Sequence, residues 1–154
     1  MEAGKDVEML RSRLSGLEGS CVKAVAMFGS RARGESGKRS DVDLFVLHEG
    51  CEIEDLVVRR RHLYDLVREA VGEEFEDVTI VDMELECFLK PKEITALLLN
   101  VYSDAVVVYD KTGILQAFLG DVREKIVKSG LKKVGDGKVH YWMLPKPLRE
   151  VRIL

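Results

Sequence analysis

Residues 27–46 read MFGSRARGESGKRSDVDLFV, and this stretch decides how the rest of the chain is interpreted. An apolar run ends at Gly29-Ser30, a basic segment follows, and Asp41 and Asp43 then precede a second apolar run. Because side chains alternate along a strand, both carboxylates are expected to project from the same face. Neighbouring carboxylates repel each other, and burial increases the repulsion. A divalent cation removes this cost, and Mg²⁺ binds one or two carboxylates together with phosphate oxygens.

The Gly29-Ser30 turn is a candidate phosphate-binding element. Glycine lets the backbone turn tightly and approach a ligand, and Ser30 can cap a following helix or bond a phosphate oxygen. Arg31 and Arg33 add further donors for phosphate. The Walker loop and the GxGxxG fingerprint are excluded, because the glycines they require are not at the right spacing. Alone, the turn or the aspartate pair fits an ordinary strand end; together they predict one site for a nucleoside triphosphate with its magnesium.

The combined pattern resembles the signature of the nucleotidyltransferase superfamily with the DNA polymerase beta-like fold. It is most similar to the minimal prokaryotic nucleotidyltransferases. The matching residues are Gly29, Ser30, Ala32, Arg33, Gly34, Ser40, Asp41, Asp43 and Leu44. The resemblance implies an α/β (α+β) fold, in which a mixed sheet is flanked by helices, followed here by a C-terminal helix and hairpin extension.

The family also uses a third carboxylate on a neighbouring strand, and the sequence offers two candidates. Asp77 and Asp82 stand at the two ends of DVTIVD. They are five residues apart, so in a regular strand they face opposite sides and only one can join the pair. Asp77 is favoured because it lies early in its strand, as the family's acid does. If neither Asp77 nor Asp82 can act as the third carboxylate, the catalytic site is expected to be impaired.

The resemblance implies a magnesium-dependent transfer of a nucleoside monophosphate, AMP from ATP, to a hydroxyl acceptor with release of pyrophosphate. Two Mg²⁺ ions would bridge the acids and the triphosphate. The implied catalytic and metal-binding residues are Asp41, Asp43 and Asp77, and the implied nucleotide-binding residues are Gly29, Ser30, Arg33 and Ser40. The alternative is an antitoxin-like protein that binds or adenylylates a helical HEPN-type partner. A homodimer is also compatible with the sequence.

The whole chain has 154 residues, is 46% hydrophobic and carries a net charge of −3. The length fits a single nucleotidyltransferase domain at 1–154, with a core at about 20–110 and an extension at 111–154. The net charge argues against nucleic-acid binding. Three cysteines far apart in sequence predict reduced thiols and a cytoplasmic location. No apolar segment approaches the ~20 residues of a membrane span.

Hydrophobic periodicity predicts alternating helices and strands. Helices are expected at 5–18, 52–71, 91–101 and 112–129, and strands at 21–28, 42–47, 77–81 and 105–109. The segment KKVGDGKVHYWML is expected to form a hairpin around Gly135-Asp136-Gly137. In this hairpin, Tyr141 and Trp142 are expected to pack onto the domain, with an exposed contact patch as the alternative.

Overall fold

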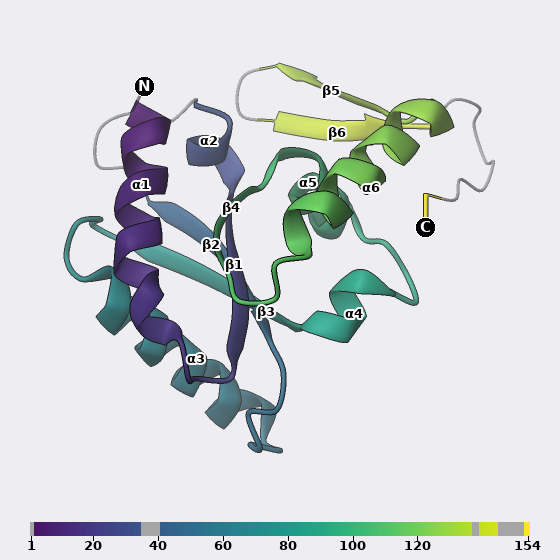
Figure 1. Cartoon of the computed structure of the whole chain (residues 1–154). Helices are drawn as coiled ribbons and strands as arrows, with labels where there is room; N and C mark the ends of the chain where they lie inside the picture. The colour runs from purple at the N-terminus through teal and green to yellow at the C-terminus, as the bar shows by residue number, and fades with distance from the viewer. Residues whose placement is uncertain (1, 35–40, 137–138, 145–152) are drawn as a thin grey trace.

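The sheet at the centre of the computed structural model is mixed, as the family resemblance implies. The structure describes residues 2–34, 41–136, 139–144 and 153–154. Four strands, β1 (Val22–Phe28), β2 (Val42–His48), β3 (Val78–Glu84) and β4 (Val106–Asp110), are ordered β3-β2-β1-β4 (Figure 1). β2 and β3 are parallel, whereas β1 is antiparallel to both of its neighbours. Each expected strand is therefore present, with small shifts at the ends.

Helices cover both faces of this sheet. α1 (Glu2–Leu14) and α3 (Leu56–Val71) lie on one face, and α4 (Leu85–Leu89), α5 (Ala96–Asp104) and α6 (Leu115–Ser129) lie on the other (Figure 1). A strand covered on both sides is expected to be apolar at nearly every position. β2 follows this rule: all of its residues are buried except Asp43, which is half-buried.

Each face has its own apolar core. Leu10 and Leu63 belong to the core under α1 and α3, and both are fully buried. The opposite core is aromatic: the ring centroids of Phe88 and Tyr102 are 5.0 Å apart. The Tyr102 hydroxyl, which is buried there, donates a hydrogen bond to the Phe88 carbonyl at 2.6 Å. This bond supplies the partner that a buried phenol requires.

Two helices begin later than hydrophobic periodicity predicts, because a capping residue sets the first position of each. The Asp55 carboxylate accepts a hydrogen bond from the Val58 N–H at 3.0 Å, so α3 begins after residue 55 and not at 52. The helix expected at 91–101 begins only at Ala96, because Thr95 caps it. α4 was not predicted. At its other end, α6 stops at Gly130, which adopts a left-handed conformation as expected.

The C-terminal hairpin is confirmed. β5 (Lys132–Asp136) and β6 (Val139–Met143) pair in an antiparallel two-stranded sheet, which lies beside α5 and α6 (Figure 1). The Trp142 indole donates to the Asn100 side-chain oxygen at 2.7 Å and packs against the aromatic core. Trp142 thus packs onto the domain as expected, whereas Tyr141 is 57% exposed.

The expectation of reduced thiols is wrong for two of the three cysteines. Cys21 and Cys51 form a disulfide, and Cys87 is free and exposed. The two bonded residues are 30 positions apart in sequence, but the antiparallel pairing of β1 with β2 brings them together. The Glu49 N–H donates to the Cys21 carbonyl at 3.0 Å at the same place.

None of the described helices is both long and apolar enough to cross a membrane.

Candidate functional site

The core of the site is a close contact between Gly29 and Asp43. β1 ends at Phe28, which is the register partner of Asp43 on β2. Gly29 starts the single turn α2 (Gly29–Ala32) with a φ of 77°. A Cβ atom at Gly29 would lie 2.2 Å from the Asp43 carboxylate oxygen Oδ2. Glycine is therefore required twice, once by the backbone angle and once by the carboxylate packed against it.

The surroundings of Asp43 make its negative charge unfavourable. Burial raises the pKa of Asp43, and the nearby charge of Asp41 raises it further. Opposing these effects, a hydrogen bond from the Thr79 side chain and the positive charge of Arg33 lower the pKa. The balance is a raised pKa. A carboxylate in this position gains from a cation placed beside it.

The two candidates for the third acid lie in different parts of the sheet. Asp77 immediately precedes β3 at the site end, where its carbonyl accepts a hydrogen bond from the Val42 N–H at 3.1 Å. Asp82 pairs in register with Val46 and contacts His48, with 3.3 Å between Asp82 Oδ2 and His48 Nε2. The structure therefore brings Asp77 to the end of the sheet that carries Asp41, and it does not bring Asp82 there.

Sequence reasoning missed Thr79. Thr79 is the register partner of Asp43 on β3 and hydrogen-bonds its carboxylate. Among the described residues, no three His, Cys, Asp or Glu side chains are grouped closely enough to hold a metal ion. Two carboxylates without a third ligand suit a Mg²⁺ ion only if phosphate oxygens complete its coordination, since that ion commonly uses one or two carboxylates together with substrate phosphates. Only the register between β2 and β3 reveals Thr79, and the sequence does not specify this register.

The arginines of the basic segment have separate environments. Arg31 is 7% exposed; its guanidinium pairs with Asp6 at 2.8 Å and lies 4.9 Å from the centre of the Phe75 ring. The expectation that Arg31 donates to phosphate is therefore corrected: its side chain joins α2 to α1. The charge of Arg33 lowers the pKa of Asp43, and Arg33 Nη1 lies 3.9 Å from Asp104 Oδ2.

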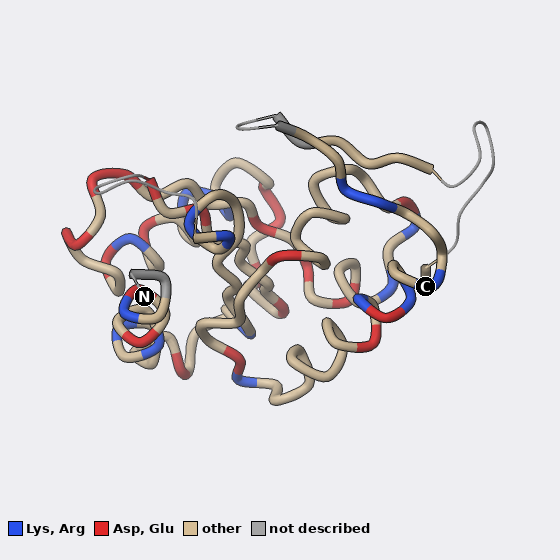
Figure 2. Tube along the Cα trace, turned by 90° about the horizontal axis from the view of Figure 1, so that it is seen from above, with Lys and Arg blue, Asp and Glu red and all other residues tan. Residues whose placement is uncertain are grey.

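Of the other two expected nucleotide-binding residues, Ser30 and Ser40, the structure describes only Ser30. Ser30 is half-buried in α2, directly after Gly29. Ser40 lies outside the described residues, as do Lys38 and Arg39. Figure 2 shows Lys and Arg interspersed with Asp and Glu along the described trace.

A cavity of about 560 Å³ lies at the other end of β2 from Asp43. It is lined by His48, Cys51 and Arg59 together with several glutamates. Burial lowers the pKa of His48, while Asp82 partly offsets this effect. No part of the Gly29–Asp43 contact lines this cavity. The cavity and the acidic pair are therefore separate features, and the candidate phosphate-binding residues lie at the acidic pair.

Three proteins of known structure resemble this chain at low sequence identity. A proposed nucleotidyltransferase of known structure from Sulfolobus solfataricus is 17% identical, with a TM-score of 0.46, over 71% of this chain and 84% of that chain. A toxin–antitoxin structure with AMP-PNP is 19% identical, with a TM-score of 0.43, over 83% and 86%. A toxin–antitoxin MntA–HpeT mutant is 16% identical, with a TM-score of 0.41, over 83% and 85%. No protein with a curated description matches the chain.

A match to a protein-family model identifies the family. The sequence model described as "Nucleotidyltransferase domain" matches residues 7–134. That range contains the Gly29-Ser30 turn, the acidic pair and all four strands of the main sheet. It also covers most of the 154 residues. The chain therefore belongs to the nucleotidyltransferase domain family.

Proposed function

We propose that this protein transfers a nucleoside monophosphate, AMP from ATP, to a hydroxyl acceptor in a magnesium-dependent reaction that releases pyrophosphate. The observation that carries the proposal is the contact between Asp43 and Gly29. The Asp43 carboxylate, whose pKa is raised, lies directly against the Gly29-Ser30 turn, which is the proposed phosphate-binding element. Asp41 is exposed, immediately before the same strand, and contributes a second negative charge.

The acidic residues would bind the metal ion, and the basic residue would bind the phosphates. Asp41 and Asp43 would hold Mg²⁺, which lowers the pKa of an attacking hydroxyl and neutralises charge on the leaving phosphates when it is bound. Thr79 holds Asp43 in place through its hydrogen bond. Gly29 keeps the backbone close to the acids, so that phosphate oxygens and carboxylates can share one cation. Arg33 supplies positive charge beside the acidic pair.

Asp77 remains the proposed third acid and would act as the general base or as a ligand of a second Mg²⁺ ion. Its position, two residues before Thr79, puts it on the same face of β3 if the strand is extended by one residue. Asp82 contacts His48 instead and serves as the matched comparison. We expect Asp77→Asn to reduce pyrophosphate release from ATP by about 100-fold or more, typical of losing an acid–base group. Asp82→Asn should leave release within a few-fold of wild type.

The first experiment is calorimetric titration of the full chain with ATP, in Mg²⁺ and in EDTA. Wild type should bind ATP tightly only in Mg²⁺, and Asp43→Asn should lose this dependence because one of the two charges that hold the ion is gone. Asp121→Asn, which changes an exposed acid on α6, is the control and should match wild type. Equal ATP binding by wild type and Asp43→Asn would remove the metal assignment.

An antitoxin-like function, in which binding matters more than catalysis, is the second candidate. The observation in its favour is that Thr79, and not an acid, is the β3 partner of Asp43. It predicts that Asp43→Asn still neutralises a co-expressed HEPN-type toxin as well as wild type does. If neutralisation requires Asp43, then the partner is a substrate and the transferase proposal accounts for both activities.

A further inference from the structure

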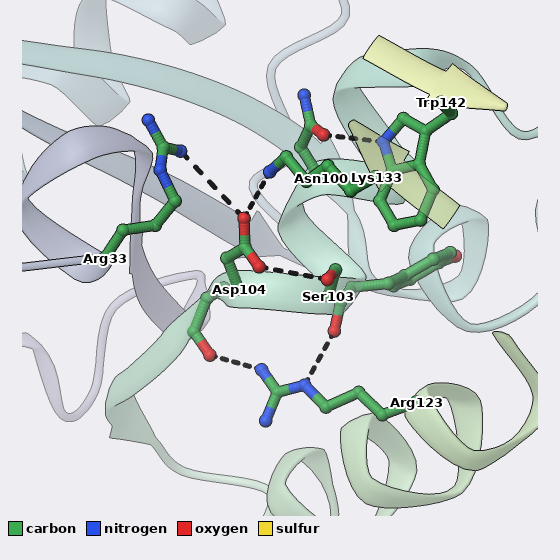
Figure 3. A network of polar contacts seen from close by, with 9 residues as sticks. Arg33, Asn100, Ser103, Asp104, Arg123, Lys133 and Trp142 are labelled. Carbon is green, nitrogen blue, oxygen red and sulfur yellow. Dashed lines mark hydrogen bonds and ion pairs between the residues drawn. The ribbon is translucent and has the colours of Figure 1, made fainter. Parts of the chain in front are cut away.

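A second group of charges lies beside the nucleotide site, at the C-terminal end of α5. Asp104 receives a cation from each of two segments that are about 100 residues apart. Arg33 follows α2, and its Nη1 is 3.9 Å from Asp104 Oδ2. Lys133 comes from β5 of the hairpin, and its ammonium contacts the same oxygen (Figure 3). The other carboxylate oxygen accepts a hydrogen bond from Ser103 at 2.9 Å.

The position of Asp104 places this cluster at the site end of the sheet. Met27 pairs with Val106 in the β1–β4 register, and Asp104 lies two residues before Val106. Met27 in turn lies two residues before Gly29, and α2 packs against α5. The charge of Arg33 acts on Asp104 and also on Asp43. Lys133 is therefore linked to the acidic pair through Asp104 and Arg33, although it is far from the sequence signature.

The cluster brings two cations to one carboxylate. Arg33 and Lys133 both pair with Asp104 Oδ2. Two cations that share an oxygen are close enough to contact neighbouring phosphates of a single triphosphate chain. The acidic pair would bind the same triphosphate through Mg²⁺, so the site has a metal-binding part and a phosphate-binding part. Charge-assisted hydrogen bonds of this kind are about twice as strong as neutral ones.

The hairpin holds Lys133 in a defined place. The Lys133 side chain is 16% exposed, and its ammonium is 5.9 Å from the centre of the Trp142 ring. Trp142 itself is hydrogen-bonded to Asn100 of α5. On the other side, Arg123 of α6 donates to the Tyr102 carbonyl at 2.9 Å and so fixes the end of α5 (Figure 3). A lysine held this way loses little rotamer freedom when it binds a ligand.

We propose that Lys133 is a phosphate-binding residue of the nucleotide site, and that the C-terminal hairpin is present to supply it. Asp104 holds the ammonium until a triphosphate arrives, and the β- or γ-phosphate then accepts a hydrogen bond from it. This inference rests on the proposed function, because it needs a triphosphate at the acidic pair. It adds a role for the extension that the sequence signature does not contain.

The test compares ATP with AMP, since only ATP carries the β- and γ-phosphates. Each nucleotide is titrated in Mg²⁺ into the full chain and into Lys133→Gln, Lys133→Arg and Lys132→Gln. Lys133→Gln should weaken ATP binding about tenfold, or about 1.4 kcal/mol, and change AMP binding by less than about twofold. Lys133→Arg keeps the charge and should retain ATP affinity. Lys132→Gln removes an exposed charge from the adjacent position of β5 and should match wild type.

A purely structural role for Lys133 makes different predictions. If Lys133 only fastens the hairpin to α5, then Lys133→Gln should weaken ATP and AMP equally, and this result overturns the inference. Lys133→Met keeps the apolar stem beside Trp142 and gives a second charge-removing variant if glutamine perturbs the fold. Unchanged ATP affinity in Lys133→Gln, with normal binding by wild type, overturns the inference alone. Failure of wild type to bind ATP overturns the proposed function and this inference with it.

Discussion

Gly29 shows how one residue can serve the backbone and the site together. Its φ of 77° suits glycine, and its missing Cβ leaves room for Asp43 Oδ2. Gly34 has a similar φ of 73°, but no atom lies within 4 Å of the position where its Cβ would be. An alanine at either position would bear the cost of the backbone angle, but only an alanine at Gly29 would also overlap another residue.

Gly29→Ala is expected to reduce the free energy of unfolding more than Gly34→Ala does. A left-handed angle costs a non-glycine residue about 1–2 kcal/mol, and both variants bear this cost. At residue 29 the new methyl group also forces the Asp43 carboxylate to move, so Mg²⁺-dependent ATP binding should be lost as well. Chemical denaturation and calorimetry measure the two effects. Equal destabilisation by the two variants would contradict the close packing of Asp43.

The raised pKa of Asp43 predicts a pH-dependent gain of stability when its charge is removed. Its folded-state pKa lies above its unfolded-state value, so ionisation of Asp43 destabilises the fold as the pH rises through this range. Asp43→Asn should therefore have a higher melting temperature than wild type at pH 7. The difference should vanish well below the unfolded-state pKa of about 4, where wild-type Asp43 is neutral in both states. A lower melting temperature for the variant at pH 7 would contradict the assigned shift.

At the scale of elements, the pairing of β1 with β2 creates both the site and the disulfide. At one end of the pair, Phe28 lies opposite Asp43, and at the other end Val22 lies opposite His48. Cys21 and Cys51 flank this second end and are joined there. The disulfide thus joins β1 and β2 at the end of the pair that is far from the acidic pair. It stabilises the β1–β2 register on which the acidic pair depends.

Reduction of the disulfide should destabilise the protein by about 3–4 kcal/mol, from the loop-closure entropy of a bridge spanning 30 residues. Denaturant unfolding with and without a reductant measures this loss, and Cys21→Ser should reproduce it. Cys87→Ser is the control, because Cys87 is free and exposed, and it should have little effect. Thiol titration should find one accessible thiol in the oxidised native chain. Three thiols before reduction would mean that the bridge does not form.

At the scale of the whole molecule, one sheet supports two cores. The strands contribute alternate residues to each, such as Leu44 to the core under α1 and α3 and Phe45 to the aromatic core. Loss of either core would expose one full face of β2, which is buried at nearly every position. The two layers are therefore expected to depend on each other for stability, and the hairpin depends on the aromatic core through Trp142.

Unfolding should accordingly be a single cooperative transition. Trp142 is the only tryptophan in the chain, so its fluorescence reports the hairpin, while far-UV circular dichroism reports the helices. The two signals should give the same midpoint in denaturant under oxidising conditions. A fluorescence transition at lower denaturant would show that the hairpin detaches first. In that case Asn100→Ala, which removes the acceptor of the Trp142 indole, should move only the fluorescence transition.

The sequence by itself determined the order of the six strands and of the four longer helices that the structure describes, and it placed the Gly29-Ser30 turn and the acidic pair between the first two strands. These features depend on local signals: apolar runs, the spacing of Asp41 and Asp43, and a glycine followed by serine. Boundaries that depend on a single capping side chain were less accurate, as the start of α5 at Ala96 shows. Short apolar segments such as α4 are ambiguous, since periodicity needs more than one helical turn to be recognised.

Only the tertiary structure decided which distant residues meet. The β2–β3 register placed Thr79 beside Asp43 and left Asp82 with His48. The β1–β2 pairing formed the Cys21–Cys51 bond, and the docking of the hairpin on α5 brought Lys133 to Asp104. The physical reason is the same throughout. Local propensity fixes what each segment becomes, whereas register and packing are set by the burial of the whole apolar surface, which no short stretch of sequence encodes.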